Sequence, residues 1–95
     1  MPIYELHLFN KTEVALVPPK AGVFVLYQLE NAIVAEGAGD LRKSLRAALK
    51  KFPAATHFAT EILPGREVTL RAQKLKEELN RVRVSTFMGV SPGAR

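Results

Sequence analysis

The chain has 95 residues, of which 47% are hydrophobic and 24% are charged, and its formal net charge is +5. This length fits one domain, and the hydrophobic fraction excludes an intrinsically disordered chain. The sequence has no cysteine, which excludes disulfides and thiolate metal sites. The longest apolar run, residues 21–27, is too short to cross a bilayer, and the first residues lack the basic segment of a secretory leader. We therefore expect a single cytoplasmic domain over residues 1–95, with no membrane partner.

The first 20 residues are predicted to form an extended segment followed by a short helix. Residues 2–9 alternate in part between apolar and polar side chains, as a strand does. Residues 10–17 are long enough for one helical turn, and Thr12 is the residue that we expect to cap it. Pro18 and Pro19 follow and stop the helix, because proline fixes φ and has no N–H to donate.

The next segment is predicted to be a β-hairpin over residues 22–36. A continuous run of β-branched and aromatic residues over 23–27 predicts a strand that is buried on both faces. Residues 28–31 are polar enough for a turn, and residues 32–35 form the returning strand. Residues 36–39 contain two glycines, so we interpret them as a flexible loop.

A helix is predicted to begin after Asp40, whose carboxylate can accept hydrogen bonds from the first free helical amides. Leucines at positions 41, 45 and 49 follow at a spacing of four, which places them on one apolar stripe. Pro53 ends the helix. Basic side chains occupy another face of it at the same spacing, namely Arg42, Arg46 and Lys50.

The second half of the chain predicts a strand over residues 56–63, closed by Pro64 and Gly65, and then a helix over residues 66–81. The apolar positions of this helix are spaced 4, 3, 4 and 3, which predicts a seam that packs on a sheet: Val68, Ala72, Leu75, Leu79 and Val82. Residues 84–90 are interpreted as a short strand or an apolar tail. The predicted fold class is α+β, with a small antiparallel or mixed sheet of about three to five strands flanked by helices.

The basic residues are concentrated in two segments, 40–51 and 66–83. The first holds five bases and one acid, and the second holds six bases and three acids. A basic field confined to two helices indicates a surface for a polyanion, such as the backbone of DNA or RNA. The candidate nucleic-acid-binding residues are Arg42, Lys43, Arg46, Lys50, Arg71 and Lys74.

The sequence offers few residues for catalysis or for a cofactor. His7 and His57 have no second histidine, cysteine or carboxylate cluster at ligand spacing, so no metal site is expected. No motif joins a nucleophile to a base and an orienting group. The glycines before Asp40 lack the Lys-Ser/Thr pair of a phosphate-binding loop, and Asp40 itself occupies the amide donors. We therefore expect no cofactor.

Two segments resemble GIY-YIG nuclease domains. Residues 19–27 (PKAGVFVLY) are similar to the first strand of that family, where P-x-x-x-G-V-Y-x-L-Y is typical. Residues 32–45 (AIVAEGAGDLRKSL) are similar to its second strand, loop and first helix, typically V-Y-I-G-K-A-x-N-L-R-x-R-L. The resemblance covers residues 17–82 and implies a GIY-YIG endonuclease-like domain. It leaves residues 1–16 as an N-terminal extension and residues 83–95 as a C-terminal strand or tail.

The resemblance implies a chemistry that uses two strand tyrosines, a helical arginine and a glutamate that binds magnesium. The tyrosines correspond to Phe24 and Val34, the arginine corresponds to Ser44, and the glutamate falls at Arg71 or Ala72. Each position departs from the family pattern, and a cation at position 71 would repel a metal ion. The sequence therefore predicts a domain without catalytic residues, and we lean towards a protein that is not an enzyme.

The predicted function is a catalytically inactive GIY-YIG-like module that binds nucleic acid non-specifically through a basic helical face. The alternative is a protein-interaction or self-associating domain, including a homodimer, that uses the seam of the second long helix and residues 82–90. A minor alternative is a residual metal-dependent nuclease that uses Glu67 or Glu36.

Overall fold

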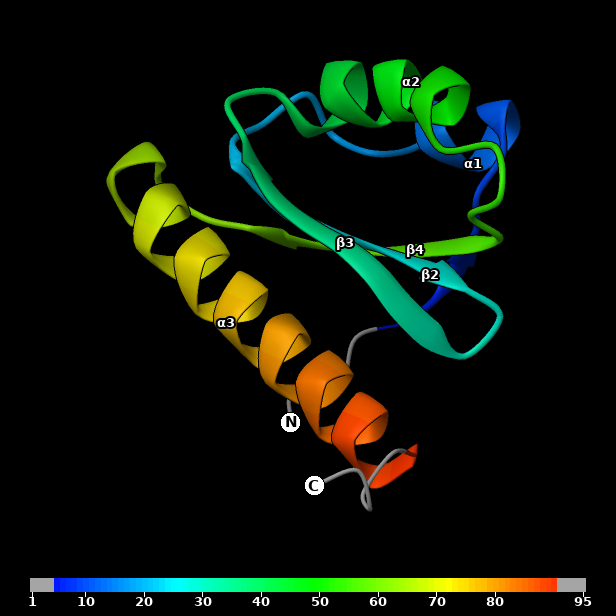
Figure 1. Cartoon of the computed structure of the whole chain (residues 1–95). Coiled ribbons are helices and arrows are strands. Elements are labelled where there is room, and N and C mark those ends of the chain that lie inside the picture. The colour runs from blue at the N-terminus through cyan, green and yellow to red at the C-terminus, as the bar shows by residue number, and fades with distance from the viewer. Residues whose placement is uncertain (1–4, 91–95) are drawn as a thin grey trace.

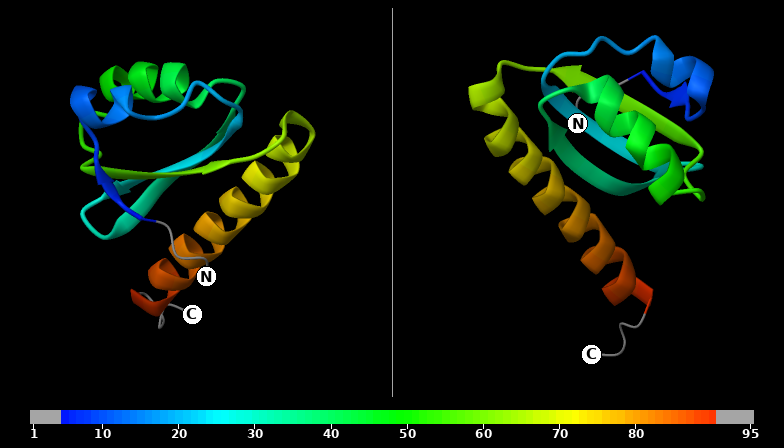
Figure 2. Two further views of the ribbon diagram at one scale, coloured as in Figure 1. Left: turned by 180° about the vertical axis from the view of Figure 1, so that it is seen from behind. Right: turned by 90° about the horizontal axis from the view of Figure 1, so that it is seen from above.

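The computed structural model describes residues 5–90, and within them the side chains of residues 5–80. Its strands form one antiparallel sheet in the order β1-β4-β2-β3, with the bounds β1 His7–Leu8, β2 Gly22–Gln28, β3 Asn31–Ala38 and β4 His57–Ile62. The helices are α1 Lys11–Ala15, α2 Leu41–Lys51 and α3 Gly65–Val90. Helices α1 and α2 cover one face of the sheet, and α3 crosses the other (Figures 1 and 2). This arrangement confirms the predicted α+β class and the predicted number of strands.

The hairpin of β2 and β3 is confirmed, but β3 is longer than predicted. The register pairs Phe24 with Glu36, Val23 with Gly37 and Gly22 with Ala38, so the expected loop over residues 36–39 is wrong for residues 36–38. A Cβ added at Gly37 would lie 2.6 Å from Cγ1 of Val68 on α3. The glycine therefore permits close packing of α3 on β3, and does not interrupt the strand.

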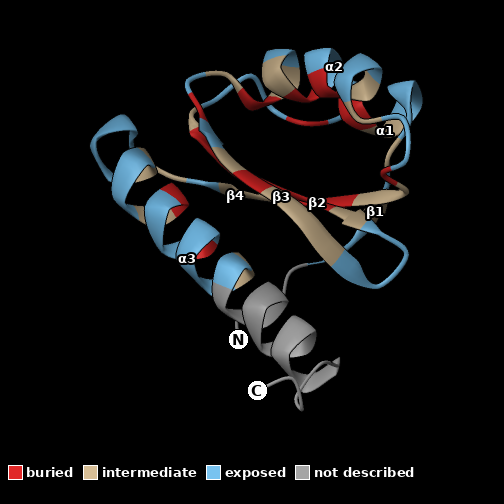
Figure 3. Cartoon of the chain, in the orientation of Figure 1, coloured by how far each residue is buried: buried red, intermediate tan, exposed pale blue. Residues whose placement is uncertain are grey.

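The core has two layers, one on each face of the sheet, as the burial colours in Figure 3 show. The layer beneath α1 and α2 includes Phe24, Leu26, Leu41, Leu45 and Phe58. The layer against α3 includes Val23, Val25, Ala35, Ala72 and Leu75. Because successive residues of a strand point to opposite faces, β2 contributes to both layers. The prediction that this strand is buried on both faces is confirmed.

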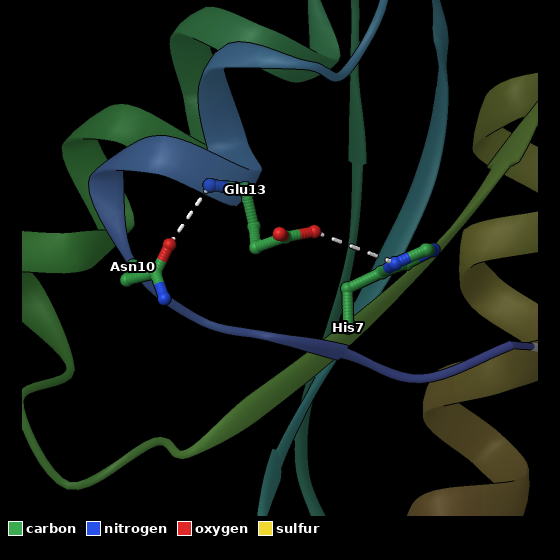
Figure 4. A network of polar contacts seen from close by, with 3 residues as sticks. All are labelled: His7, Asn10 and Glu13. Carbon is green, nitrogen blue, oxygen red and sulfur yellow. Dashed lines mark hydrogen bonds and ion pairs between the residues drawn. The ribbon is translucent and has the colours of Figure 1, made fainter.

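Side-chain caps fix where α1 and α2 begin. Oδ1 of Asp40 accepts a hydrogen bond from the backbone N–H of Lys43 at 3.0 Å, as predicted. In α1 the cap is Asn10, whose Oδ1 accepts from the N–H of Glu13 at 2.8 Å (Figure 4). The predicted cap, Thr12, is wrong because it is the second residue of the helix, whereas Asn10 has the extended backbone that a cap requires.

Helix α3 confirms the predicted seam and extends beyond the predicted end. Ala72 and Leu75 are buried against the sheet, with Val68 and Leu79 half-buried beside them, so this part of the seam packs on its own chain. The predicted strand or tail is wrong for residues 83–90, which continue the helix; the first proline that opposes helix lies further on, at position 92.

Some predictions concern residues outside the part that the structure describes. They are the extended backbone of residues 2–4, the side chain of Val82 and the tail over residues 91–95. Within the described residues, every helix is too short or too polar to cross a bilayer.

Candidate nucleic-acid interface

The outward face of α2 presents three basic side chains, Lys43, Arg46 and Lys50, which we call the α2 basic face. At 3.6 residues per turn they lie within about 60° of one another, on the side of the helix away from its buried stripe. All three are exposed. Within residues 5–80, their side chains form no ion pair or hydrogen bond with other residues. Their charges therefore face solvent without internal neutralisation.

Arg42 belongs to the same helix but is used within the fold. Its Nε donates a hydrogen bond to the backbone carbonyl of Val17 at 2.8 Å, and the side chain is partly buried. This bond joins α2 to the segment that follows α1. Arg42 therefore contributes charge near the α2 basic face, while its guanidinium is anchored to the protein.

Arg71 and Lys74 lie on α3, across the sheet from α2 (Figure 1). Nε of Arg71 lies 2.9 Å from Oε1 of Glu61 on β4, and the two side chains are 25% and 34% exposed. This ion pair neutralises the charge of Arg71, whereas Lys74 is exposed. The prediction that all six basic residues form one surface is wrong, because the two helices pack on opposite faces of the sheet.

The positions that the resemblance assigns to the catalytic residues of GIY-YIG nucleases are also divided between the two faces. Phe24 is 3% exposed in the layer beneath α2, Val34 packs against the same layer, and Ser44 is half-buried on α2. Ala72 is buried in the α3 layer, and Arg71 pairs with Glu61. Magnesium prefers oxygen ligands, and these five residues offer one hydroxyl and no carboxylate. They do not fit a magnesium ion, so we derive no metal-dependent step from them.

The other acidic and imidazole groups are dispersed. Glu36 is opposite Phe24 on β3 and therefore on the α2 side of the sheet, whereas Glu67 is exposed in the first turn of α3. Nδ1 of His7 lies 3.8 Å from Oε1 of Glu13 (Figure 4), and Nδ1 of His57 lies 2.9 Å from the hydroxyl of Thr56. In the part of the chain that the structure describes, no three His, Asp or Glu residues gather as a metal site would require.

A cleft of about 500 Å³ lies between the end of β3 and the first turns of α3. Thr69, Gln73 and Lys76 of α3 form its polar side. No motif in the sequence predicted this cleft. Its one signal in the sequence is a polar stripe at a spacing of 4 and 3 beside the apolar seam of α3.

No protein-family model matches the sequence, and the search of curated proteins also finds no match. Solved structures do match. One is the GIY-YIG N-terminal endonuclease domain of UvrC from Thermotoga maritima, bound to its catalytic divalent cation, magnesium: the TM-score is 0.66 at 19% identity, over 74% of this chain and 89% of that one. A tyrosine-to-phenylalanine point mutant of the same domain, bound to the catalytic divalent cation, gives a TM-score of 0.66 at 20% identity, over 74% and 88%. The chain described above therefore has the fold of the GIY-YIG endonuclease domains.

Proposed function

We propose that this protein is a nucleic-acid-binding module that has the GIY-YIG fold without the nuclease chemistry. The observation that carries the proposal is the α2 basic face, three exposed bases without an internal partner in the described residues. The fold supports it, since the structures that the chain matches are endonuclease domains.

Binding through this face follows from the chemistry of its side chains. Lysine and arginine on the outside of a helix neutralise phosphates, and such contacts do not read the sequence of bases. Three phosphate contacts with duplex DNA give a slope of about −2.7 in a plot of log K against log salt concentration. Affinity is therefore expected to fall about 40-fold between 50 and 200 mM salt.

The loss of catalysis is inferred from the residues that stand at the family positions. Phe24 has no hydroxyl to orient or activate water, and its ring is enclosed in the core. Arg71 has the opposite charge from a metal ligand, and its guanidinium is held by Glu61. A divalent cation near this pair would be repelled by Arg71, and would have to displace it to reach Glu61.

Two measurements test the proposal together. Fluorescence anisotropy with labelled single-stranded and duplex DNA should show binding at 50 mM salt and little dependence on sequence. At 200 mM salt the affinity should fall about 40-fold for the duplex and about 18-fold for the single strand. Incubation of the protein with supercoiled plasmid and magnesium should leave the plasmid intact. No anisotropy change at tens of micromolar protein in 50 mM salt contradicts the binding. Magnesium-dependent nicking that is abolished in Glu67→Gln or Glu36→Gln contradicts the loss of catalysis and supports the residual nuclease.

A further inference from the structure

The cleft between β3 and α3 is separate from the α2 basic face. Its walls come from the end of the edge strand β3, from Ala21 before β2, and from the first three turns of α3. Its volume of about 500 Å³ falls within the range of roughly 300–1,000 Å³ that is typical of small-ligand pockets.

The walls of the cleft consist mostly of glycine and alanine. Gly37 is explained by packing, because a Cβ there would meet Val68 and Ala72. Gly39 and Gly65 have no such explanation, since a Cβ at either position would have no atom from another part of the chain within 4 Å. Neither has a positive φ that would require glycine. Both residues line the cleft, so their missing side chains keep it open.

The remaining side of the cleft is polar and includes a positive charge. Thr69, Gln73 and Lys76 extend along one side of α3, and they offer a hydroxyl, a carboxamide and an ammonium group. The residues that line the cleft include no aspartate or glutamate. Such a lining favours a ligand with one anionic group, a polar edge that can both donate hydrogen bonds to a carboxamide and accept them from it, and a flat portion that fits between the glycine and alanine residues.

We propose that this cleft binds a single unpaired nucleotide. The base lies between the peptide planes and methyl groups of the small residues, with the Gln73 carboxamide at its edge, and the phosphate lies near Lys76. This inference rests on the proposed function, because it assigns to the nucleic acid a second contact that depends on strand separation. The α2 basic face contacts only phosphates and therefore binds both single-stranded and duplex nucleic acid, whereas the cleft favours single strands.

Titration with adenosine 5′-monophosphate tests the cleft independently of the α2 basic face. In ¹H–¹⁵N spectra the amide signals of Gly37, Gly39, Gln73 and Lys76 should shift and saturate, with a dissociation constant of about 1 mM or lower. Adenosine and inorganic phosphate should each bind more weakly. Gly39→Val should weaken binding of the nucleotide at least about tenfold with an unchanged urea midpoint, because its Cβ meets no protein atom.

Charge is tested by a matched pair of variants on α3. Lys76→Gln should weaken nucleotide binding by up to about fivefold, the upper end of the range for an exposed ion pair. Lys74→Gln removes the same charge from an exposed position outside the cleft and should leave nucleotide binding unchanged. Gly39→Val should also reduce the affinity for single-stranded DNA more than the affinity for duplex.

The results separate this inference from the proposed function. Non-saturating shifts with the nucleotide, equal affinity for inorganic phosphate, or an unchanged affinity in both Gly39→Val and Lys76→Gln would each overturn the nucleotide site. Any of these results, together with salt-dependent duplex binding, leaves the proposed function in place. Saturable nucleotide binding in the cleft without binding of DNA supports the site and overturns the proposed function.

Discussion

Gly37 lies in β3 where this strand packs against α3, and its replacement by alanine tests how closely the two elements pack. The added Cβ would lie 2.6 Å from Cγ1 of Val68 and 3.3 Å from Cβ of Ala72. The first distance is below any ordinary carbon–carbon contact, so either Val68 or the helix must move. Overpacking of this kind costs about 1–3 kcal/mol of unfolding free energy. Alanine is favoured over glycine in a strand by about 0.5–1 kcal/mol, which offsets part of the loss.

The same geometry predicts that Val68→Ala rescues Gly37→Ala. Truncation of Val68 removes the atom at 2.6 Å, and the next contacts lie at 3.3 Å and beyond. Val68→Ala alone should destabilise the protein, because it removes half-buried methyl groups from the α3 layer. In the double variant the two changes should be coupled favourably by about 1–2 kcal/mol.

Urea denaturation of the wild type, both single variants and the double variant measures this coupling. Gly22→Ala serves as a contrast. Its Cβ would clash with the backbone oxygen of Glu61 and lie 3.0 Å from Cα of Ile62, and truncation of a side chain such as Leu41 cannot relieve these backbone contacts. The packing of Val68 on Gly37 would be refuted if the losses of unfolding free energy in Gly37→Ala and Val68→Ala summed to the loss in the double variant within about 0.5 kcal/mol.

Three further predictions concern the turn, the core and the alkaline stability. Leu29 has a φ of 58° in the hairpin turn and a mostly exposed side chain, so Leu29→Gly should raise the unfolding free energy by up to about 1 kcal/mol, seen as a higher urea midpoint. Leu45 is fully buried beneath α2, and Leu45→Ala should cost about 2–5 kcal/mol, measured in the same way. Burial raises the pKa of Tyr27 above its ordinary value of 10.0. The folded state therefore holds that proton more tightly than the unfolded state, and stability falls as pH rises above about 10. Tyr27→Phe should reduce this loss of stability at high pH. An identical pH dependence of the urea midpoint in the wild type and Tyr27→Phe would contradict a role for the Tyr27 hydroxyl.

Much of the fold could be predicted from local patterns. The apolar run over residues 23–27 indicated the central strand, and Asp40 with the leucine stripe indicated where α2 begins and which side it buries. These signals are reliable because they depend on a side chain and its neighbours in sequence. Gly37 was misinterpreted as part of a loop, because the reason for this glycine lies in α3, which is distant in sequence.

The candidate site was predicted less completely. The sequence indicated which residues of α2 and α3 face away from their apolar stripes, but it did not indicate on which face of the sheet each helix packs. The six basic residues were therefore expected together and are separated by the sheet. The bonds of Arg42 to Val17 and of Arg71 to Glu61 also depend on contacts between distant segments. Residues 84–90 were interpreted as a short strand or an apolar tail, whereas the backbone continues as helix to Val90.

We attribute nucleic-acid binding to the exposed bases of α2, and not to positive charge in general. Two double variants with the same change of charge test it most directly by anisotropy with duplex DNA at 50 mM salt. Arg46→Gln with Lys50→Gln removes two exposed bases from the α2 basic face, and Arg66→Gln with Lys74→Gln removes two exposed bases from α3. The α2 pair should weaken binding strongly and lower the salt slope by about 1.8, whereas the α3 pair should leave the affinity and the slope nearly unchanged. Equal losses of affinity in the two double variants would contradict it.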